Sequence, residues 1–387
     1  MSSANTFTGL RVLEFTTTIA GPYSAMILAD LGADVIKVER PGRGDDARGM
    51  PPHLDGASAV FHAVNHNKRS VVLDVKEAAG REAFLRLAGD SDVVVQSFRP
   101  GAAERLGLGF DDVHARNPRA VYCSVSAFGT SGGGLAGYDP LVQAFTGIMS
   151  MTGEPGGAPV RVAPSLVDLT TGMWAAIAIM AALGRRTSTG VGEHVEATLV
   201  DSGYALLCHQ IVGMYATGEV PGPLGSASPI TAPYESFGTA DGQVMIAAGN
   251  DRLFGLLCAA LGIPALATDP RCAVAAERVR HRDLVHAEVQ RRVGTLTTGE
   301  CLERLRTAGV PVAPVNDLLQ AVEDPVAVSR GTVRAPDEPG GLPSVRLPFH
   351  DRGTVRRRAP RLGEHSVPVL RAAGYSDEDI ARLSAPG

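Results

Sequence analysis

A single carboxylate, Asp168, stands just before a long apolar run. The stretch from Arg161 to Trp174 reads RVAPSLVDLTTGMW and leads into the apolar residues Met173 to Leu183. Pro164 and Ser165 are typical of a helix boundary and its cap, so this pattern predicts a buried helix with Asp168 at or near its first turn. A carboxylate held there in a partly dry site could attack an activated acyl group. The simpler alternative is that Asp168 only caps the helix by accepting backbone N–H bonds.

The first 130 residues alternate strand and helix patterns that could position such a residue. Alternation of this kind predicts an α/β fold, with a parallel sheet covered by helices. Ligands of these folds gather at the carboxyl ends of the strands. The predicted strands are Leu10–Phe15, Ala33–Glu39, Ser70–Val75, Asp92–Phe98 and Ala120–Ser126, and the predicted helices are a segment that ends near Leu31, Ala79–Ala88 and Ala102–Leu106.

The first strand–helix turn argues against a nicotinamide dinucleotide as cofactor. Glu39 ends the second strand, where a ribose-binding acid would stand. The turn Thr16–Pro22, however, reads TTTIAGP and lacks the G-x-G-x-x-G spacing that lets backbone approach a pyrophosphate. No phosphate-binding G-x-x-x-x-G-K motif occurs either. We therefore expect no prosthetic group and no metal.

Positive charge recurs at the strand ends. Arg40 follows the second strand, Lys76 the third and Arg99 the fourth, while Lys68 and Arg69 come before the third. If the strands are parallel, Arg40, Lys76 and Arg99 lie along one edge of the sheet, where they suit a polyanionic nucleotide. The alternative is that each basic residue flanks a strand only to remain in water.

Composition narrows the class of protein further. A chain of 387 residues with 44% hydrophobic residues predicts two folded domains. The net charge of −5 argues against general nucleic-acid binding. Five scattered cysteines indicate neither a disulfide framework nor a zinc site. The N-terminus resembles no signal peptide, and in the sequence pattern no apolar run approaches the length that spans a bilayer, so we expect a cytoplasmic protein without a membrane segment.

Linker composition predicts how the chain divides. Residues 218–229 and about 323–343 are rich in proline and glycine. Between them, two short strand patterns flank the turn Thr239–Gly242 and are followed by helical patterns, as in a compact α+β domain. The predicted organisation is a large α/β domain at 1–200, a linker at 201–230, a small α+β domain at 231–318, a linker at 319–343, and a C-terminal return to the large domain at 344–387.

Several motifs in fixed order resemble the class III coenzyme A transferases, the family of formyl-CoA transferase and carnitine CoA-transferase. The resemblance covers nearly the whole chain. The motifs are GLRVLEF, ADVIKVERP, NHNKRSVVLDVK, SFRPGAAERLG, GYDPLVQA, SLVDLTTG and, at Arg358–Ser366, RAPRLGEHS.

This resemblance implies an acyl-CoA:carboxylate CoA-transferase with Asp168 as the nucleophile. Asp168 would form a mixed anhydride with the acyl group and then an aspartyl-CoA thioester, with Tyr138 and Asp139 in the same active site. Its substrates would be an acyl-CoA and a free carboxylic acid, so CoA is a substrate and not a prosthetic group. The family further implies a ring-shaped protomer in an interlocked homodimer. The residues at CoA-contacting positions of the family are Ile19, Ala20, Arg40, Leu73 to Lys76, Ser97, Phe98, Arg99 and Arg105.

Two alternatives remain open at this point. The related α-methylacyl-CoA racemases share the fold but need two acid–base groups, one of them a histidine where this chain has Tyr138. A phenol is a poor proton acceptor near neutral pH. A catalytically silent acyl-CoA-binding protein would keep the basic edge and would not need Asp168. The sequence leaves the acyl group itself undetermined.

Overall fold

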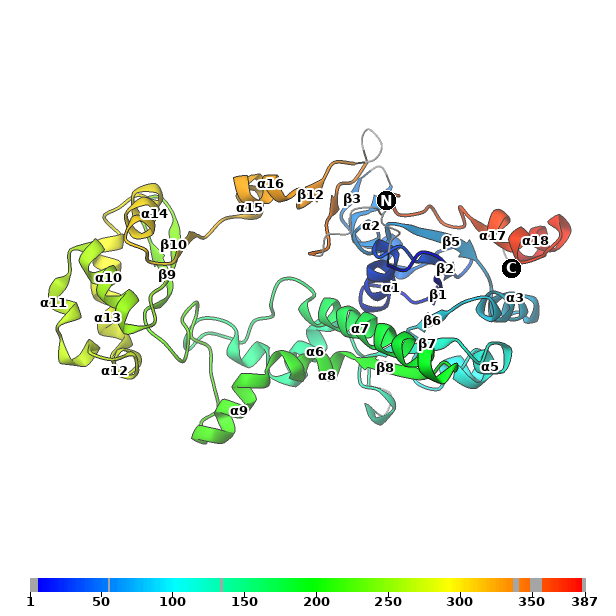
Figure 1. Ribbon diagram of the computed structural model, residues 1–387, viewed down its shortest axis with the longest axis horizontal. Coiled ribbons are helices and arrows are strands. Elements are labelled where there is room, and N and C mark those ends of the chain that lie inside the picture. The colour runs from blue at the N-terminus through cyan, green and yellow to red at the C-terminus, as the bar shows by residue number, and fades with distance from the viewer. Residues whose placement is uncertain (1–5, 55, 133–134, 337–340, 349–356, 385–387) are drawn as a thin grey trace. The chain divides into compact units, whose positions relative to one another are not determined.

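The structure of the protein is a computed structural model (Figure 1), which describes residues 6–54, 56–132, 135–336, 341–348 and 357–384. The chain divides into two compact units. The first unit holds residues 1–148, 161–217 and 330–387, and the second holds 149–160 and 218–329.

The units differ from the predicted domain boundaries in three segments, the first of which is 149–160, expected in the large domain but part of the second unit. Helices α8 (Leu199–Leu206) and α9 (Cys208–Thr217) lie in the first unit, although 201–230 was expected to be a linker. Ser202 explains the placement of α8, because its hydroxyl accepts a hydrogen bond from the Thr171 hydroxyl in the core of that unit. Helix α15 (Leu318–Glu323), expected at the edge of a linker, lies in the second unit.

A parallel sheet of six strands forms the centre of the first unit and confirms the predicted α/β class. Its order is β5-β2-β1-β6-β7-β8, so the direction of the winding reverses between β1 and β6. In doubly wound sheets the ligand site lies at such a reversal, outside the carboxyl ends of the strands. The strands are β1 (Arg11–Phe15), β2 (Asp34–Glu39), β5 (Lys68–Val72), β6 (Val93–Gln96), β7 (Val121–Ser126) and β8 (His194–Thr198).

Helices cover both faces of this sheet. Leu13, Ile36 and Val94 pack with Phe84 of α3 (Ala78–Gly89) and with Leu370 of α17 (Ser366–Ala372) on one face. On the other face α7 lies against α1 and against β7 and β8 (Figure 1). Helices of this unit are α1 (Ala20–Asp30), α2 (Ala59–Asn65), α4 (Ala102–Arg105), α5 (Phe110–Arg116), α6 (Asp139–Thr146), α7 (Leu166–Thr189), α17 (Ser366–Ala372) and α18 (Asp377–Ser384).

Helix α7 corrects one expectation from the sequence. It spans Leu166–Thr189 and is long and apolar enough to cross a membrane by length and composition. The expectation that no apolar run is long enough to span a membrane was wrong, because the apolar stretch Met173–Leu183 is only the middle of α7. The helix packs on α1 and on the sheet, and core helices of globular proteins pass the same test.

Lys68 corrects a second expectation. Lys68 and Arg69 do not precede a strand; they form the beginning of β5. The side chain of Lys68 is fully buried, because its ammonium group lies 2.7 Å from the Glu14 carboxylate and donates to the carbonyl oxygen of Pro22 at 2.8 Å. Arg69 pairs with Asp34 at the start of β2. Neither residue is free to bind a nucleotide.

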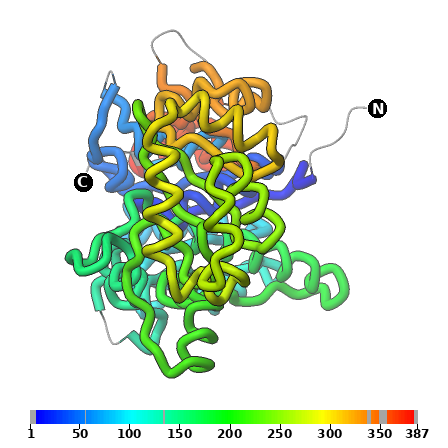
Figure 2. The backbone as a smooth tube through the Cα atoms, turned by 90° about the vertical axis from the view of Figure 1, so that its left-hand side faces the viewer, coloured from blue at the N-terminus to red at the C-terminus, as the bar shows by residue number. Residues whose placement is uncertain are grey.

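The second unit is an antiparallel sheet covered by helices. Strands β9 (Tyr234–Gly238), β10 (Gln243–Ala247) and β11 (Val312–Pro314) pair in the order β11-β10-β9, around the turn expected at Thr239–Gly242. Phe237, Val244 and Leu257 belong to one apolar core. The covering helices, yellow-green to yellow in Figure 2, are chiefly α10 (Asp251–Leu261), α13 (Arg282–Val293) and α14 (Thr298–Thr307), with the shorter α11 (Pro264–Ala267) and α12 (Ala275–Arg280). Helix α16 (Pro325–Arg330) belongs to the same unit.

Candidate active site

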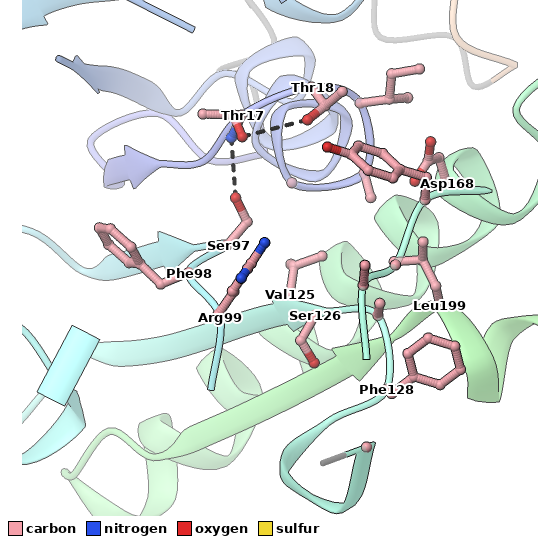
Figure 3. A pocket seen from close by; sticks show the side chains of 18 of the residues that line it. Thr17, Thr18, Ser97, Phe98, Arg99, Val125, Ser126, Phe128, Asp168 and Leu199 are labelled. Atoms are coloured by element: carbon pink, nitrogen blue, oxygen red, sulfur yellow. Dashed lines mark hydrogen bonds between the residues drawn. The ribbon is translucent and has the colours of Figure 1, made fainter. Parts of the chain in front are cut away.

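A cavity of about 350 Å³ opens at the carboxyl edge of the first unit's sheet, where the winding reverses. Its walls are the segments after β1, β6 and β7, together with the start of α7. Figure 3 shows Asp168 pointing from the start of α7 toward the ends of these strands. The labelled lining residues are Thr17, Thr18, Ser97, Phe98, Arg99, Val125, Ser126, Phe128, Asp168 and Leu199.

Asp168 lies in the first turn of α7, as predicted, but it does not cap the helix. The cap residue Ser165 makes no side-chain hydrogen bond to the helix. Asp139 does so in its place, because its Oδ2 accepts from the backbone N–H groups of Val167 at 2.7 Å and Asp168 at 3.1 Å. Gln143 Nε2 donates to the other oxygen of Asp139 at 2.5 Å. Asp139, and not Asp168, is therefore the residue that caps α7.

The surroundings of Asp168 favour its protonated form. Burial, and then the like charge of Asp139, raise the pKa of Asp168 to about 7. Within the described part of the chain, no hydrogen-bond donor is directed at its carboxylate. An anionic Asp168 is consequently poorly solvated, which is the state in which a carboxylate reacts best as a nucleophile.

The loop from β1 to α1 forms the wall opposite Asp168. The backbone N–H of Thr17 donates to Ser97 Oγ at 3.1 Å, which joins the loops on the two sides of the winding reversal (Figure 3). Thr18 has a φ of 75°, in the left-handed region. Ile19 and Ala20 follow and line the cavity. Since α1 begins at Ala20, the first N–H groups of the helix lie at this wall.

Gly172 fixes the approach of α1 to α7. A Cβ atom at Gly172 would lie 2.7 Å from the carbonyl oxygen of Ala20 and 3.0 Å from the ring of Tyr23. Only glycine lets the two helices come this close. The starting end of α1 is therefore set against the same helix that carries Asp168.

A second cavity, of about 220 Å³, adjoins the first and shares Thr17 and Phe98 with it. Arg40 and Lys76 lie in its lining, as expected from the parallel arrangement of β2 and β5. Arg40 forms an ion pair with Asp46, which lines the first cavity. A ligand with an anionic end and a thioester end could therefore occupy both cavities.

The structure gathers most of the predicted site residues and leaves two outside. Asp168, Tyr138, Ile19, Ala20, Ser97 and Arg99 line the first cavity, Arg40, Leu73 and Lys76 line the second, and Phe98 lines both. Arg105 is exposed on α4 and Asp139 is buried, and neither is in the lining of either cavity. In the parts of the chain that the structure describes, no three His, Cys, Asp or Glu side chains are grouped to hold a metal ion.

Sequence reasoning missed the end of β7 and the residues just after it as part of the site. Val125, Ser126 and Phe128 line the first cavity beside Asp168. A signal was present, since ligands gather at the carboxyl ends of parallel strands and Ala120–Ser126 was a predicted strand. Its sequence, however, carries no charged residue that would have attracted notice.

Comparison with known proteins gives a consistent result. The family model of CoA-transferase family III matches residues 7–366. The succinate–glutarate CoA-transferase of Agrobacterium fabrum is 37% identical over 98% of this chain and 97% of its own length. The acetyl-CoA:oxalate CoA-transferase of Acetobacter aceti is also 37% identical, over 94% of each chain. The crystal structure of a CAIB/BAIF family protein from Brucella suis matches with a TM-score of 0.86 and 36% identity, covering 96% of this chain and 100% of that one.

Proposed function

Since the chain belongs to CoA-transferase family III and is therefore a CoA-transferase, we propose that it moves CoA between two carboxylic acids through covalent intermediates on Asp168. The observation that carries this proposal is the half-buried Asp168 carboxylate. It lies in a cavity at the carboxyl edge of the sheet, and Asp139 has taken the helix N–H groups that would otherwise bind it.

The reaction has two balanced halves. A carboxylate oxygen of Asp168 attacks the thioester carbonyl carbon, the C–S bond breaks, and CoA departs as a thiolate. Asp168 and the acyl group are then joined as a mixed anhydride. The thiolate then attacks the aspartyl carbonyl carbon, which releases the first acid and forms an aspartyl-CoA thioester. In the second half, the acceptor carboxylate attacks the aspartyl-CoA carbonyl carbon and displaces CoA thiolate, which gives a second mixed anhydride. The thiolate then attacks the acyl carbonyl carbon of this anhydride, which gives the new acyl-CoA and free Asp168 with no net transfer of protons.

The wall opposite Asp168 supplies stabilisation for each tetrahedral intermediate. The first backbone N–H groups of α1 have no partner inside the helix and carry its positive dipole end. Ile19 and Ala20 place this end at the cavity. One such donor to an oxyanion typically contributes about 3–4 kcal/mol.

The second cavity is our proposed site for the nucleotide part of CoA. Arg40 and Lys76 supply charge there, Leu73 and Phe98 supply apolar surface, and Arg99 lines the adjoining first cavity. CoA phosphates would replace Asp46 as the partner of Arg40. Arg105, exposed on the neighbouring α4, would reach the nucleotide only from outside the cavity.

Short dicarboxylic acids are the substrate class that we propose first. Two relatives are named for succinate, glutarate and oxalate. Arg99 is the basic residue in the lining of the first cavity, and a second carboxylate of a substrate would need such a partner.

We also infer an interlocked homodimer that acts in the cytoplasm. Support for self-association comes from exposed apolar side chains, which include Tyr215 on α9, 81% exposed, and Leu318 on α15, 82% exposed. Neither helix has a buried residue within its own described chain. Sedimentation at nanomolar concentration should give a dimer, and a stable folded monomer would contradict the inference.

A panel assay tests the proposed function. The protein is incubated with acyl-CoA thioesters and free mono- and dicarboxylic acids in deuterated water, and products are followed by mass spectrometry. We expect new thioesters only when a free acid is present, and a hydroxylamine-sensitive adduct on Asp168. Rapid deuterium uptake at the α-carbon of a 2-methylacyl-CoA without any acid would instead favour the racemase, with Tyr138 as one of its acid–base groups. Binding of CoA with neither reaction would favour a silent binding protein.

A further inference from the structure

Four buried charged side chains lie beneath the loop that joins β1 to α1, and we call them the ion cluster: Glu14, Lys37, Asp45 and Lys68. Each of these side chains is fully buried. Lys37 Nζ lies 2.8 Å from Glu14 Oε1 and 2.9 Å from Asp45 Oδ2. Lys68 Nζ lies 2.7 Å from the other oxygen of Glu14.

Such a cluster is expensive to bury. Removing an ion from water costs several kcal/mol, and well-packed apolar residues often give equal or greater stability. A role in fixing one conformation is the alternative explanation, and it requires that the cluster hold something specific.

The contacts of the ion cluster point to the loop above it. Lys37 Nζ donates to the carbonyl oxygen of Thr16 at 2.9 Å, and Thr16 Oγ1 donates to Glu14 Oε1 at 2.6 Å. Asp45 Oδ1 accepts from the backbone N–H of Thr18 at 2.9 Å. Together with the bond from Thr17 to Ser97, three consecutive loop residues are held.

Thr18 is the residue that needs this support. Its φ of 75° places a β-branched residue in the left-handed region, a strained conformation that persists only where surrounding contacts impose it. The next residues are Ile19 and Ala20, which line the cavity at the start of α1. The backbone of Thr18 therefore sets where this wall stands relative to Asp168.

We propose that Asp45, held by Lys37, is a positioning residue for CoA transfer: it keeps Thr18 left-handed and so fixes the start of α1 opposite Asp168. This inference rests on the proposed function for its kinetic consequence, and on the loop geometry alone for its structural one. Asp45 also borders the second cavity. A role through Thr18 changes kcat, whereas a lost contact to the nucleotide changes KM.

The structural consequence is measured without any assumption about activity. Hydrogen exchange is followed by mass spectrometry on a peptide spanning residues 16–22 in the wild type and in Asp45→Asn. Asparagine keeps an acceptor for Thr18 but removes the charge that Lys37 holds. We expect exchange in this peptide to be at least about tenfold faster in the variant. The matched control is Asp92→Asn at the opposite edge of the sheet, where Asp92 accepts from the N–H of Arg11 at 2.9 Å and pairs with Arg186; it should leave the peptide unchanged.

The kinetic consequence is measured by a double-mutant cycle. Asp45→Asn should lower kcat about 10–100-fold, the effect of a small misplacement of reacting groups, with KM for the acyl-CoA within about threefold. Glycine adopts a positive φ without penalty, so Asp45→Asn made in a Thr18→Gly background should lower kcat by a smaller factor. Equal losses in both backgrounds would show that Asp45 does not act through Thr18.

Failure of this inference is distinct from failure of the proposed function. A wild type that transfers no CoA refutes the proposed function, while unchanged exchange at residues 16–22 in Asp45→Asn refutes the positioning role. If Asp45→Asn does not fold, Ser97→Ala replaces it, because this change removes only the hydroxyl that accepts from Thr17. Faster exchange confined to residues 16–22 supports the inference that these contacts hold the loop in place, and unchanged exchange overturns that inference.

Discussion

Asp168 and Asp45 lie at the same edge of one sheet, Asp168 half-buried and Asp45 buried, and the charges nearest to them are opposite in sign. Asp45 has the ammonium group of Lys37 at 2.9 Å and two backbone N–H donors, from Thr18 and Ala47. Asp168 has a second carboxylate, Asp139, as its charged neighbour. Burial disfavours ionisation of both. The charge and hydrogen bonds around Asp45 overcome it and hold the pKa of Asp45 below its usual range, whereas burial and Asp139 raise the pKa of Asp168 to about 7.

This difference separates two uses of a buried acid. A carboxylate whose lone pairs are all engaged fixes the backbone around it, but it has no electron pair available for a substrate. A carboxylate without donors costs stability and remains available to react. The carboxyl edge of the sheet thus combines a rigid part and a reactive part, with the loop Thr16–Ala20 between them.

The largest expected effect comes from removing the reactive acid. Asp168→Asn should reduce CoA transfer by more than about 10²-fold, because within the proposed mechanism no other group forms the anhydride. Steady-state rates with the best acyl-CoA and acid pair from the panel provide the measurement. Binding of CoA by calorimetry is the control and should stay within a few-fold. Activity above about one hundredth of wild type would place the nucleophile elsewhere.

Stability should change in opposite directions at the two acids. The folded state raises the pKa of Asp168 from 3.8 to about 7, so stability from this group is lost as pH rises through that window. Asp168→Asn should therefore increase the free energy of unfolding near pH 8 by about 2–4 kcal/mol, with little gain near pH 4. Asp45→Asn should decrease it by about 3 kcal/mol at neutral pH, since it leaves Lys37 short of a partner. Denaturant unfolding of both variants at the two pH values makes the comparison. A loss of stability in both near pH 8 would contradict it.

A weaker effect is expected from the binding residues at the same edge. Arg40→Ala and Lys76→Ala should each raise KM for the acyl-CoA about tenfold with kcat nearly unchanged, because phosphate contacts are the same in ground and transition states. Added salt should weaken wild-type binding more than binding by these variants. Arg116→Ala is the matched control, since Arg116 pairs with Glu82 outside both cavities. A fall in kcat at constant KM would assign Arg40 or Lys76 a different role.

The smallest expected effect concerns the charge of Asp139. Below about pH 7 Asp168 becomes protonated and cannot attack, so kcat/KM should fall on the acid side with a midpoint near that value. Asp139→Asn removes the like charge but keeps an oxygen for the N–H groups of Val167 and Asp168. The midpoint should move to lower pH by about one unit, while burial keeps it above that of a free carboxylate. Asp92→Asn carries the same charge change at the opposite edge and should not move it.

The sequence predicted what depends on local pattern. Hydrophobic runs predicted five of the six strands of the sheet, and Ser165 with the apolar run after it predicted a helix start at Asp168. The sixth strand, His194–Thr198, was missed because it is a short edge strand with exposed charged and polar residues.

Contacts between distant residues could not be predicted in this way. Asp139 caps α7 from 28 residues away, and Glu14 of β1 meets Lys68 of β5 across the intervening strand β2. Nothing in the local sequence distinguishes Lys68, whose ammonium group is buried, from Lys76, which lines a cavity. The pairing depends on strand order, which the strand patterns alone left undetermined.

Gly172 has a consequence for how relatives of this protein can diversify. Because any side chain there would strike the carbonyl oxygen of Ala20, the spacing between the nucleophile's helix and the opposite wall cannot be adjusted from α7. Acceptance of bulkier or smaller acids must evolve elsewhere around the cavity, and Ser126 at the end of β7 and Phe128 just after it are two lining positions where it could do so. Position 172 should therefore remain glycine across enzymes that differ in their acids, while positions 126 and 128 vary with the acid used.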